Sequence, residues 1–374
     1  MKKEVDGDPP VLPEKIIRNI LKRLPVKSLV RFQCVCRHWR NLFKTAAFIA
    51  DHLHHSNHQN PYLLFQRDGW DDPSNLYWLD SEMQVRDFQN PPLLDYLKRG
   101  KIVGSSNGLL CVEINKHDVS PHFLLVWNPA IREVRLVPET NFHEDYYLYS
   151  VAFGFSPVIN DYKIVILYVN EYYTELSAVK VYSLSSGSWK EVKFRVNHST
   201  CLHSHCVTVN GVMFWLGSKR VGEDPDDNEG LIVSLDLATE AFRVIPIPEH
   251  DFFSTLAVYE EKLAMVSGIR STGHSVIHLW VMEQGVVASG ERWNWTKKYT
   301  SSPYPCKLYP RTIWRNVIVC TDDMEDESTA VLFNLTTKRI KKLAISKCDD
   351  GHDIFNYAES LVPVGGMKSF ANFL

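Results

Sequence analysis

The 374-residue sequence has no strong excess of charge of either sign, because 41 lysines and arginines face 44 aspartates and glutamates. This balance gives no electrostatic reason to expect binding to nucleic acid or to an anionic membrane. The sequence also has no apolar run near the ~18 residues of a membrane helix, and its first ten residues have no signal-like apolar core. We therefore expect a protein partner, no nucleic acid and no membrane.

The eight cysteines are scattered and form no disulfide-like framework, which favours a reducing cytoplasmic or nuclear location, or both. Motifs of enzymes are also lacking: the sequence has no phosphate-cradling GxGxxG or GxxxxGK[ST] and no GxSxG nucleophile elbow. Cys201, His203, His205 and Cys206 are a conceivable metal cluster, but their spacing matches no recognised zinc signature and they fall in a predicted loop. The sequence predicts no catalytic residue, no cofactor and no metal site.

The segment Leu12 to Phe43 contains a dense set of apolar residues at helical spacing. Pro13 suits the start of a helix, Pro25 ends it, Ser28 is a candidate N-cap of a second helix, and a third helix follows Cys36. Three short helices of about 40 residues cannot bury so many apolar side chains alone. The segment therefore predicts an apolar surface that a second protein covers.

This segment, LPEKIIRNILKRLPVKSLVRFQCVCRHW, resembles the F-box of plant F-box proteins. The resemblance implies docking on the Skp-type adaptor of a Skp, cullin, F-box ubiquitin ligase. It assigns adaptor binding to thirteen positions, namely Leu12, Pro13, Ile16, Ile17, Ile20, Leu21, Leu24, Pro25, Leu29, Phe32, Val35, Cys36 and Trp39.

The chain after the F-box begins with one more predicted helix, which Thr45 could cap. From residue 62 onward the sequence changes to short β-rich runs separated by polar turns. We expect a disordered tail at 1–11, a helical module at 12–56, a linker at 57–61, a β domain at 62–363 and a C-terminal tail at 364–374.

The β domain contains a weak internal repeat. Its clearest unit, CVTVNGVMFWLGS followed by LIVSLDLATEAFRVIPIP, predicts four strands with tight turns at Asn210-Gly211 and Ala238-Thr239-Glu240. Equivalent positions in the six units are Asp80, Asn128, Ser183, Asp236, Met282 and Asn334, at intervals close to the ~40–50 residues of a propeller blade. We therefore predict a six-bladed β-propeller, with Ala358 to Pro363 as a late strand that closes it, and keep a pair of β-sandwiches as the alternative.

The segments GSSNGLLCV, VWNPAIREV, AFGFSPVINDYKIV, VNGVMFWL and ESLVP resemble the F-box-associated, kelch-like domain of plant F-box proteins. The sequence departs from kelch repeats because its one Gly-Gly pair, Gly365-Gly366, follows the last unit. Together, the two resemblances predict a three-helix all-α F-box followed by an all-β propeller.

In a four-stranded blade, the loops from second to third strand and those between blades emerge on one face. Acidic and aromatic residues are frequent in these loops, so we expect this face to hold a target protein with a basic segment. The candidate residues are Trp70, Asp72, Tyr146, Tyr147, Tyr172, Tyr173, Asp226, Asp227, Phe252, Phe253, Asp323 and Glu325.

The sequence thus favours a non-catalytic substrate receptor that binds a Skp-type adaptor and, through it, a cullin. The alternatives are a scaffold that binds the adaptor without degradation of a target, and a metal-dependent propeller enzyme.

Overall fold

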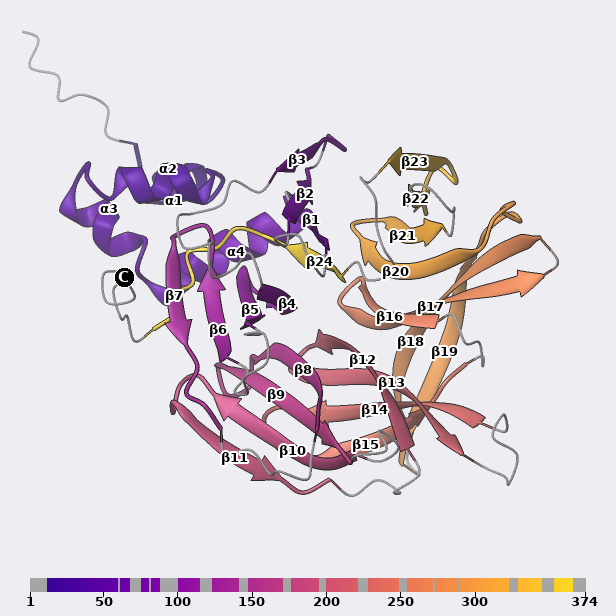
Figure 1. Ribbon diagram of the computed structural model, residues 1–374. Helices are drawn as coiled ribbons and strands as arrows, with labels where there is room; N and C mark the ends of the chain where they lie inside the picture. The colour runs from indigo at the N-terminus through magenta and orange to yellow at the C-terminus, as the bar shows by residue number, and fades with distance from the viewer. Residues whose placement is uncertain are drawn as a thin grey trace, which may run out of the picture.

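The computed structural model describes residues 12–59, 61–67, 75–80, 82–87, 100–114, 123–140, 147–170, 176–194, 200–220, 228–248, 254–271, 273–287, 290–322, 329–344 and 353–365. Over these ranges the chain forms a helical module followed by a ring of six four-stranded antiparallel sheets (Figure 1). The six-bladed propeller predicted from the repeat is confirmed, and the paired sandwiches are not what forms.

The helical module has four helices in the described chain, α1 (Glu14–Leu21), α2 (Val26–Phe32), α3 (Arg37–Leu42) and α4 (Ala46–Gln59). Pro13 and Pro25 precede α1 and α2 with extended ψ angles of 141° and 146°. The second helix therefore begins at Val26 rather than near Ser28, because Pro25 itself takes the N-cap position. The Thr45 hydroxyl accepts from the Phe48 N–H at 3.3 Å, as predicted for a cap. Helix α4 continues through Gln59, so the predicted linker 57–61 begins inside a helix.

In each blade, one edge strand lies at the centre of the ring and the other three follow it outward. The strands of the blades, from the centre outward, are β24 (Asp353–Tyr357), β1 (Tyr62–Arg67), β2 (Asn75–Leu79) and β3 (Val85–Asp87); β4 (Gly100–Ser106), β5 (Leu109–Ile114), β6 (Phe123–Asn128) and β7 (Glu133–Leu136); β8 (Tyr147–Ser156), β9 (Asp161–Val169), β10 (Leu176–Ser183) and β11 (Ser188–Val192); β12 (Thr200–Val209), β13 (Val212–Arg220), β14 (Asn228–Asp236) and β15 (Phe242–Pro246); β16 (Ser254–Tyr259), β17 (Lys262–Ser271), β18 (His274–Val287) and β19 (Gly290–Thr300); and β20 (Leu308–Trp314), β21 (Val317–Asp322), β22 (Thr329–Asn334) and β23 (Ile340–Ala344). Middle strands such as β21 are buried along their whole length, because each sheet packs between two neighbouring sheets.

The ring closes where the C-terminal strand β24 pairs with β1, the first strand of the propeller (Figure 1). The pairing is antiparallel and runs from Tyr62 opposite Tyr357 to Gln66 opposite Asp353. The predicted closing strand at Ala358 to Pro363 is therefore wrong, because closure uses the five residues that precede it. Residues 358–364 have no assigned secondary structure and belong to none of the six sheets.

Five of the six repeat positions found in the sequence lie at the same place in their blades, at the end of the third strand. Four of them accept backbone N–H groups of the following turn through a side-chain oxygen, namely Asp80, Asn128, Asp236 and Asn334. Ser183 does the same with one N–H, at 3.2 Å. Met282 differs because it lies inside β18, which continues to Val287 and forms one long hairpin with β19. Short polar side chains that hydrogen-bond to nearby backbone N–H groups favour such turns, which explains why Asp, Asn and Ser recur at these positions of the repeat.

The inner strands approach closely around the centre. A Cβ atom at Gly104 of β4 would lie 2.7 Å from the Cβ of Phe153 in β8, so glycine is required there. Side chains also bond across blades: Ser105 Oγ donates to the Asn356 carbonyl oxygen at 2.8 Å, and Asn356 Nδ2 donates to that of Ile313 at 2.8 Å. These bonds join the blades of β4, β24 and β20.

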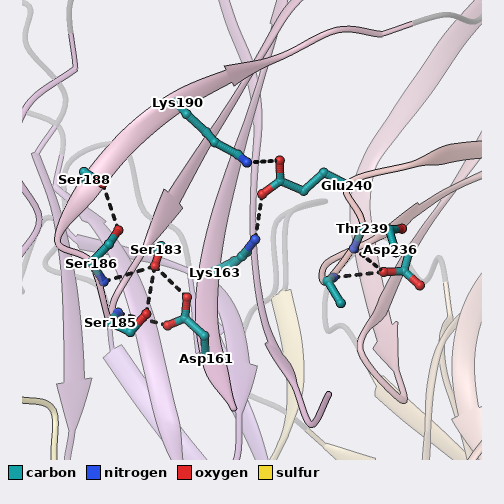
Figure 2. Close-up of polar contacts among 11 residues, drawn as sticks. Asp161, Lys163, Ser183, Ser185, Ser186, Ser188, Lys190, Asp236, Thr239 and Glu240 are labelled. Atoms are coloured by element: carbon teal, nitrogen blue, oxygen red, sulfur yellow. Dashed lines mark hydrogen bonds and ion pairs between the residues drawn. The ribbon is translucent and has the colours of Figure 1, made fainter. Parts of the chain in front are cut away.

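One glutamate joins two neighbouring blades through a charged cluster, shown in Figure 2. Glu240, in the turn after β14, pairs with Lys163 of β9 at 2.7 Å and with Lys190 of β11. Lys163 and Glu240 are both largely buried, with 7% and 12% of their side chains exposed. Burial alone would raise the pKa of Glu240, but the hydrogen bonds and charges of the two lysines outweigh it and hold the pKa below its ordinary value.

Replacing Glu240 by Gln should lower the free energy of unfolding at pH 7 by about 3 kcal/mol, because it leaves Lys163 charged and buried. A lowered carboxyl pKa contributes stability that is present above the ordinary pKa of 4.5 and is lost as pH falls through the folded pKa. The difference between wild type and E240Q should therefore be full at pH 7 and shrink below about pH 4.5 in urea denaturation.

The matched control is Glu283→Gln, since Glu283 also bridges two lysines, Lys262 and Lys298, but on the open surface. Exposed ion pairs contribute little to the free energy of unfolding, so this variant should unfold like the wild type both at pH 7 and below about pH 4.5. Equal effects of the two substitutions would contradict the role given to burial.

Candidate functional site

Helix α1 presents two different apolar faces. Leu12, Ile16 and Ile20 recur every four residues and are 52%, 46% and 48% exposed. Ile17, Leu21 and Leu24 point instead into the helical module, where Leu21 is only 2% exposed. Since residues four apart lie on the same side of a helix, Ile16 and Ile20 share one face of α1, and the exposed Leu12 precedes that helix by two residues. We call Leu12, Ile16 and Ile20 the outer stripe.

The thirteen residues predicted to bind an adaptor divide according to these faces. Seven are exposed: Leu12, Pro13, Ile16, Ile20, Pro25, Val35 and Cys36. Four are half-buried, Ile17, Leu24, Phe32 and Trp39, and two are buried in the module, Leu21 and Leu29. The sequence pattern alone did not separate surface from interior, because both sets recur at helical spacing.

The turn after α2 adds to the exposed apolar surface. Val35 is 62% exposed, and Cys36 beside it accepts the Trp39 N–H at 3.4 Å and so caps α3. His38 in α3 lies 3.6 Å from Glu14 at the start of α1, which brings the beginnings of these two helices together. The start of α1 and the start of α3, which the Val35 turn precedes, therefore lie at the same end of the module.

The interior of the module is closed by aromatic packing and two polar contacts. Phe43 and Phe48 are buried with ring centroids 5.2 Å apart. Arg18 of α1 donates to Asp51 of α4 at 2.8 Å, and His52 Nε2 lies 3.0 Å from the Leu24 carbonyl oxygen. Burial lowers the pKa of His52, so its ring is neutral at pH 7. The outer stripe is thus held on a packed support.

The module is not independent of the propeller, because the chain after β24 completes its core. Leu361 is 6% exposed and belongs to the same apolar cluster as Leu21, Val26 and Phe48. Ala130 and Ile131, in the turn after β6, pack against this cluster from the propeller side. We call residues 358–364 the clasp. The sequence pattern marked residues 358–363 as a closing strand, but no signal linked them to the helices, which lie about 300 residues earlier in the chain.

Polar contacts fix the clasp at both ends. Asn128 Nδ2 donates to the carbonyl oxygens of Ser360 and Val362 at 3.1 and 2.8 Å. Glu359 accepts the Val26 N–H at 3.3 Å at the start of α2. Burial raises the pKa of Glu359, while that hydrogen bond and the charge of Lys27 oppose the rise. The clasp therefore connects the end of β6 in the propeller with the start of α2 in the helical module.

The predicted acidic and aromatic loop face falls mostly outside the described residues. Of its twelve candidates only Tyr147 is described; it opens β8 and is 48% exposed. The other eleven are Trp70, Asp72, Tyr146, Tyr172, Tyr173, Asp226, Asp227, Phe252, Phe253, Asp323 and Glu325.

The conceivable metal cluster lies in an inner strand. Residues 201–206 belong to β12, so their predicted placement in a loop between blades is wrong. A register shift between Leu202 and Cys206 interrupts the alternation that would have aligned the cysteines and histidines. Within the part of the chain that the structure describes, no three His, Cys, Asp or Glu residues converge as a metal site would require. Over the same ranges no helix has the length and apolar character to cross a bilayer.

These features define a two-part protein in which a helical module with an exposed apolar stripe is fixed to a six-bladed propeller. Comparison with known families gives the same division: the F-box domain model matches residues 10–49, and the F-box associated beta propeller domain model matches residues 78–364. The chain belongs to the family of F-box proteins with an F-box associated β-propeller.

Relatives cover nearly the whole chain. F-box protein CPR1 of Arabidopsis thaliana is 26% identical over 392 residues, which cover 94% of this chain and 88% of the relative. An F-box/kelch-repeat protein of the same plant is 24% identical, with 91% and 93% covered. Among solved structures, the β-propeller domain of the trilobed protease from Pyrococcus furiosus covers 76% of this chain and 80% of that chain, with 8% identity and a TM-score of 0.40.

Proposed function

We propose that this protein is the substrate-recognition subunit of a Skp, cullin, F-box ubiquitin ligase. The observation that carries the proposal is the outer stripe, three large apolar side chains that stay exposed although the module behind them is packed. Contiguous exposed apolar residues of this kind mark protein interaction sites. The stripe and the exposed Val35 turn would be covered by the Skp-type adaptor, which links the chain to a cullin.

In this role the chain supplies proximity and no reacting group. The propeller would hold a target protein while a conjugating enzyme at the far end of the cullin transfers ubiquitin to it. Holding two reactants together can contribute about 7–11 kcal/mol of a reaction barrier as translational and rotational entropy already lost. We accordingly propose a non-catalytic protein of the cytoplasm, the nucleus or both.

We also propose that the loop-rich face, including Tyr147, contacts a basic segment of the target. Charge complementarity would speed and orient the encounter, and aromatic side chains would anchor it. The support for this part is the acidic and aromatic composition of the loops.

The test is affinity purification under proteasome inhibition, with the double variant L12A/P13A as the control that loses the adaptor. We expect a target protein that binds to the wild type and to L12A/P13A alike. This target should be ubiquitylated and degraded only in the presence of the wild type. A third arm, in which Asp226, Asp227, Asp323 and Glu325 are replaced by Lys, should lose the target and keep the adaptor. A bound protein whose turnover is the same with wild type and L12A/P13A would instead identify a non-degradative scaffold.

A further inference from the structure

The centre of the propeller contains a cavity of about 300 Å³ at the face where the tight turns lie. Every inner strand contributes to it, with Ser106 from β4, Phe155 from β8, Thr208 from β12, Val258 from β16, Thr312 from β20 and Asn356 from β24. The turns at Asn107 and Asn210 also line it. The helical module attaches to this same face through the turn after β6 and the clasp.

The lining carries hydrogen-bonding groups but no charge of fixed sign. Among the described residues that line it there is no lysine, arginine, aspartate or glutamate, and the only titratable side chains among them are those of His205 and Cys206. Burial raises the pKa of the Cys206 thiol, which keeps it protonated. Amide and hydroxyl groups such as those of Asn107 and Thr208 both donate and accept hydrogen bonds. A charged guest would lose its hydration here without meeting a counter-charge.

The cavity also has an apolar part. Phe155 and Phe355 line it half-buried, and Pro157 stands at its edge. The next two residues in the turn, Val158 and Ile159, are 79% and 42% exposed. Large apolar side chains in the lining of a polar cavity favour a guest with an apolar portion over water alone.

We propose that this cavity binds an uncharged ligand that joins an apolar part the size of an aromatic ring to an amide or hydroxyl group. The volume is at the lower end of the ~300–1,000 Å³ of ligand pockets and equals about ten water molecules. A free small molecule and a projecting side chain of a bound protein share this chemistry. None of the cavity's described lining residues belongs to the outer stripe.

The test uses three probes that share one ring and differ in charge: benzamide, benzoate and benzylammonium. Binding to the full chain, co-purified with its adaptor, is followed by saturation-transfer NMR titration. Benzamide should bind about tenfold or more tightly than either charged probe, because the cavity offers no counter-charge. A fourth probe, N-acetylphenylalanine amide, distinguishes the two sources: it should match or exceed benzamide if a protein side chain is the natural guest and bind more weakly if a small molecule is.

Two variants place the binding in the cavity. Ser106→Trp fills it and should weaken benzamide binding about tenfold or more, whereas the matched Ser302→Trp, at an exposed residue outside the lining, should not. Thr208→Val keeps the shape, removes one hydroxyl and should cost about three- to tenfold, which gives a second measurement if S106W fails to fold. Unchanged benzamide binding in S106W and T208V, equal binding of the charged probes, or no binding to the wild type would overturn the proposal.

Discussion

Replacing Ile20 by Asp should weaken binding of a Skp-type adaptor by about 100-fold or more. Ile20 belongs to the outer stripe and is 48% exposed in the free chain, so the substitution leaves the packed module almost untouched. In the complex it would place an unpaired carboxylate in an apolar interface, at a cost of about 3 kcal/mol or more. Titration of the purified chain with adaptor, by calorimetry or interferometry, measures the loss.

Two further variants distinguish loss of adaptor contact at the outer stripe from unfolding of the module behind it. Val158→Asp places the same charge at an exposed apolar residue of the propeller and should leave adaptor affinity unchanged. Leu21→Asp changes a buried residue of the same helix and should unfold the module, seen as lost helical circular dichroism. If I20D binds the adaptor like the wild type and stays folded, the outer stripe is not the adaptor surface.

Replacing Leu361 by Asp should release the helical module from the propeller and destabilise it by at least about 3 kcal/mol. Truncating a buried leucine to alanine costs about 2–5 kcal/mol, and a buried carboxylate adds its own desolvation. Leu361 is 6% exposed between the helices and the turn after β6. Hydrogen exchange should therefore show loss of protection in α1, α2 and α4, with protection of β16–β19 retained.

Pro363→Asp is the matched control, because Pro363 lies two residues further along the clasp and is exposed. It should leave the exchange of the helices unchanged. Equal protection of the helices in L361D and the wild type would show that the module folds and docks without the clasp.

The clasp has a consequence for how such a subunit works. It contacts both the helical module and the blade of β4–β7, so it links the two parts by a second connection besides the chain itself. An adaptor bound at the outer stripe would then hold the propeller at one orientation. A fixed orientation keeps a bound target at a defined place relative to the transfer enzyme, which is what catalysis by proximity requires.

Local signals in the sequence determined the element types and their repetition. Prolines at 13 and 25 separated the helices, and Asp80, Asn128, Asp236 and Asn334 marked the turns, because each acts on backbone within a few residues of itself. These signals were enough for the helical module and the six blades. They do not depend on which segments meet in space.

Contacts between distant segments were decided only by the tertiary structure. The closing strand is Asp353–Tyr357 and not residues 358–363, because Leu361 of the latter packs against the helices that begin the chain. Ile20 and Leu21 are neighbours with the same apolar character, yet one is exposed and one is buried. Spacing along one helix shows that two faces exist, but only the residues packed against them, Leu361 and Ile131 among them, decide which face turns inward.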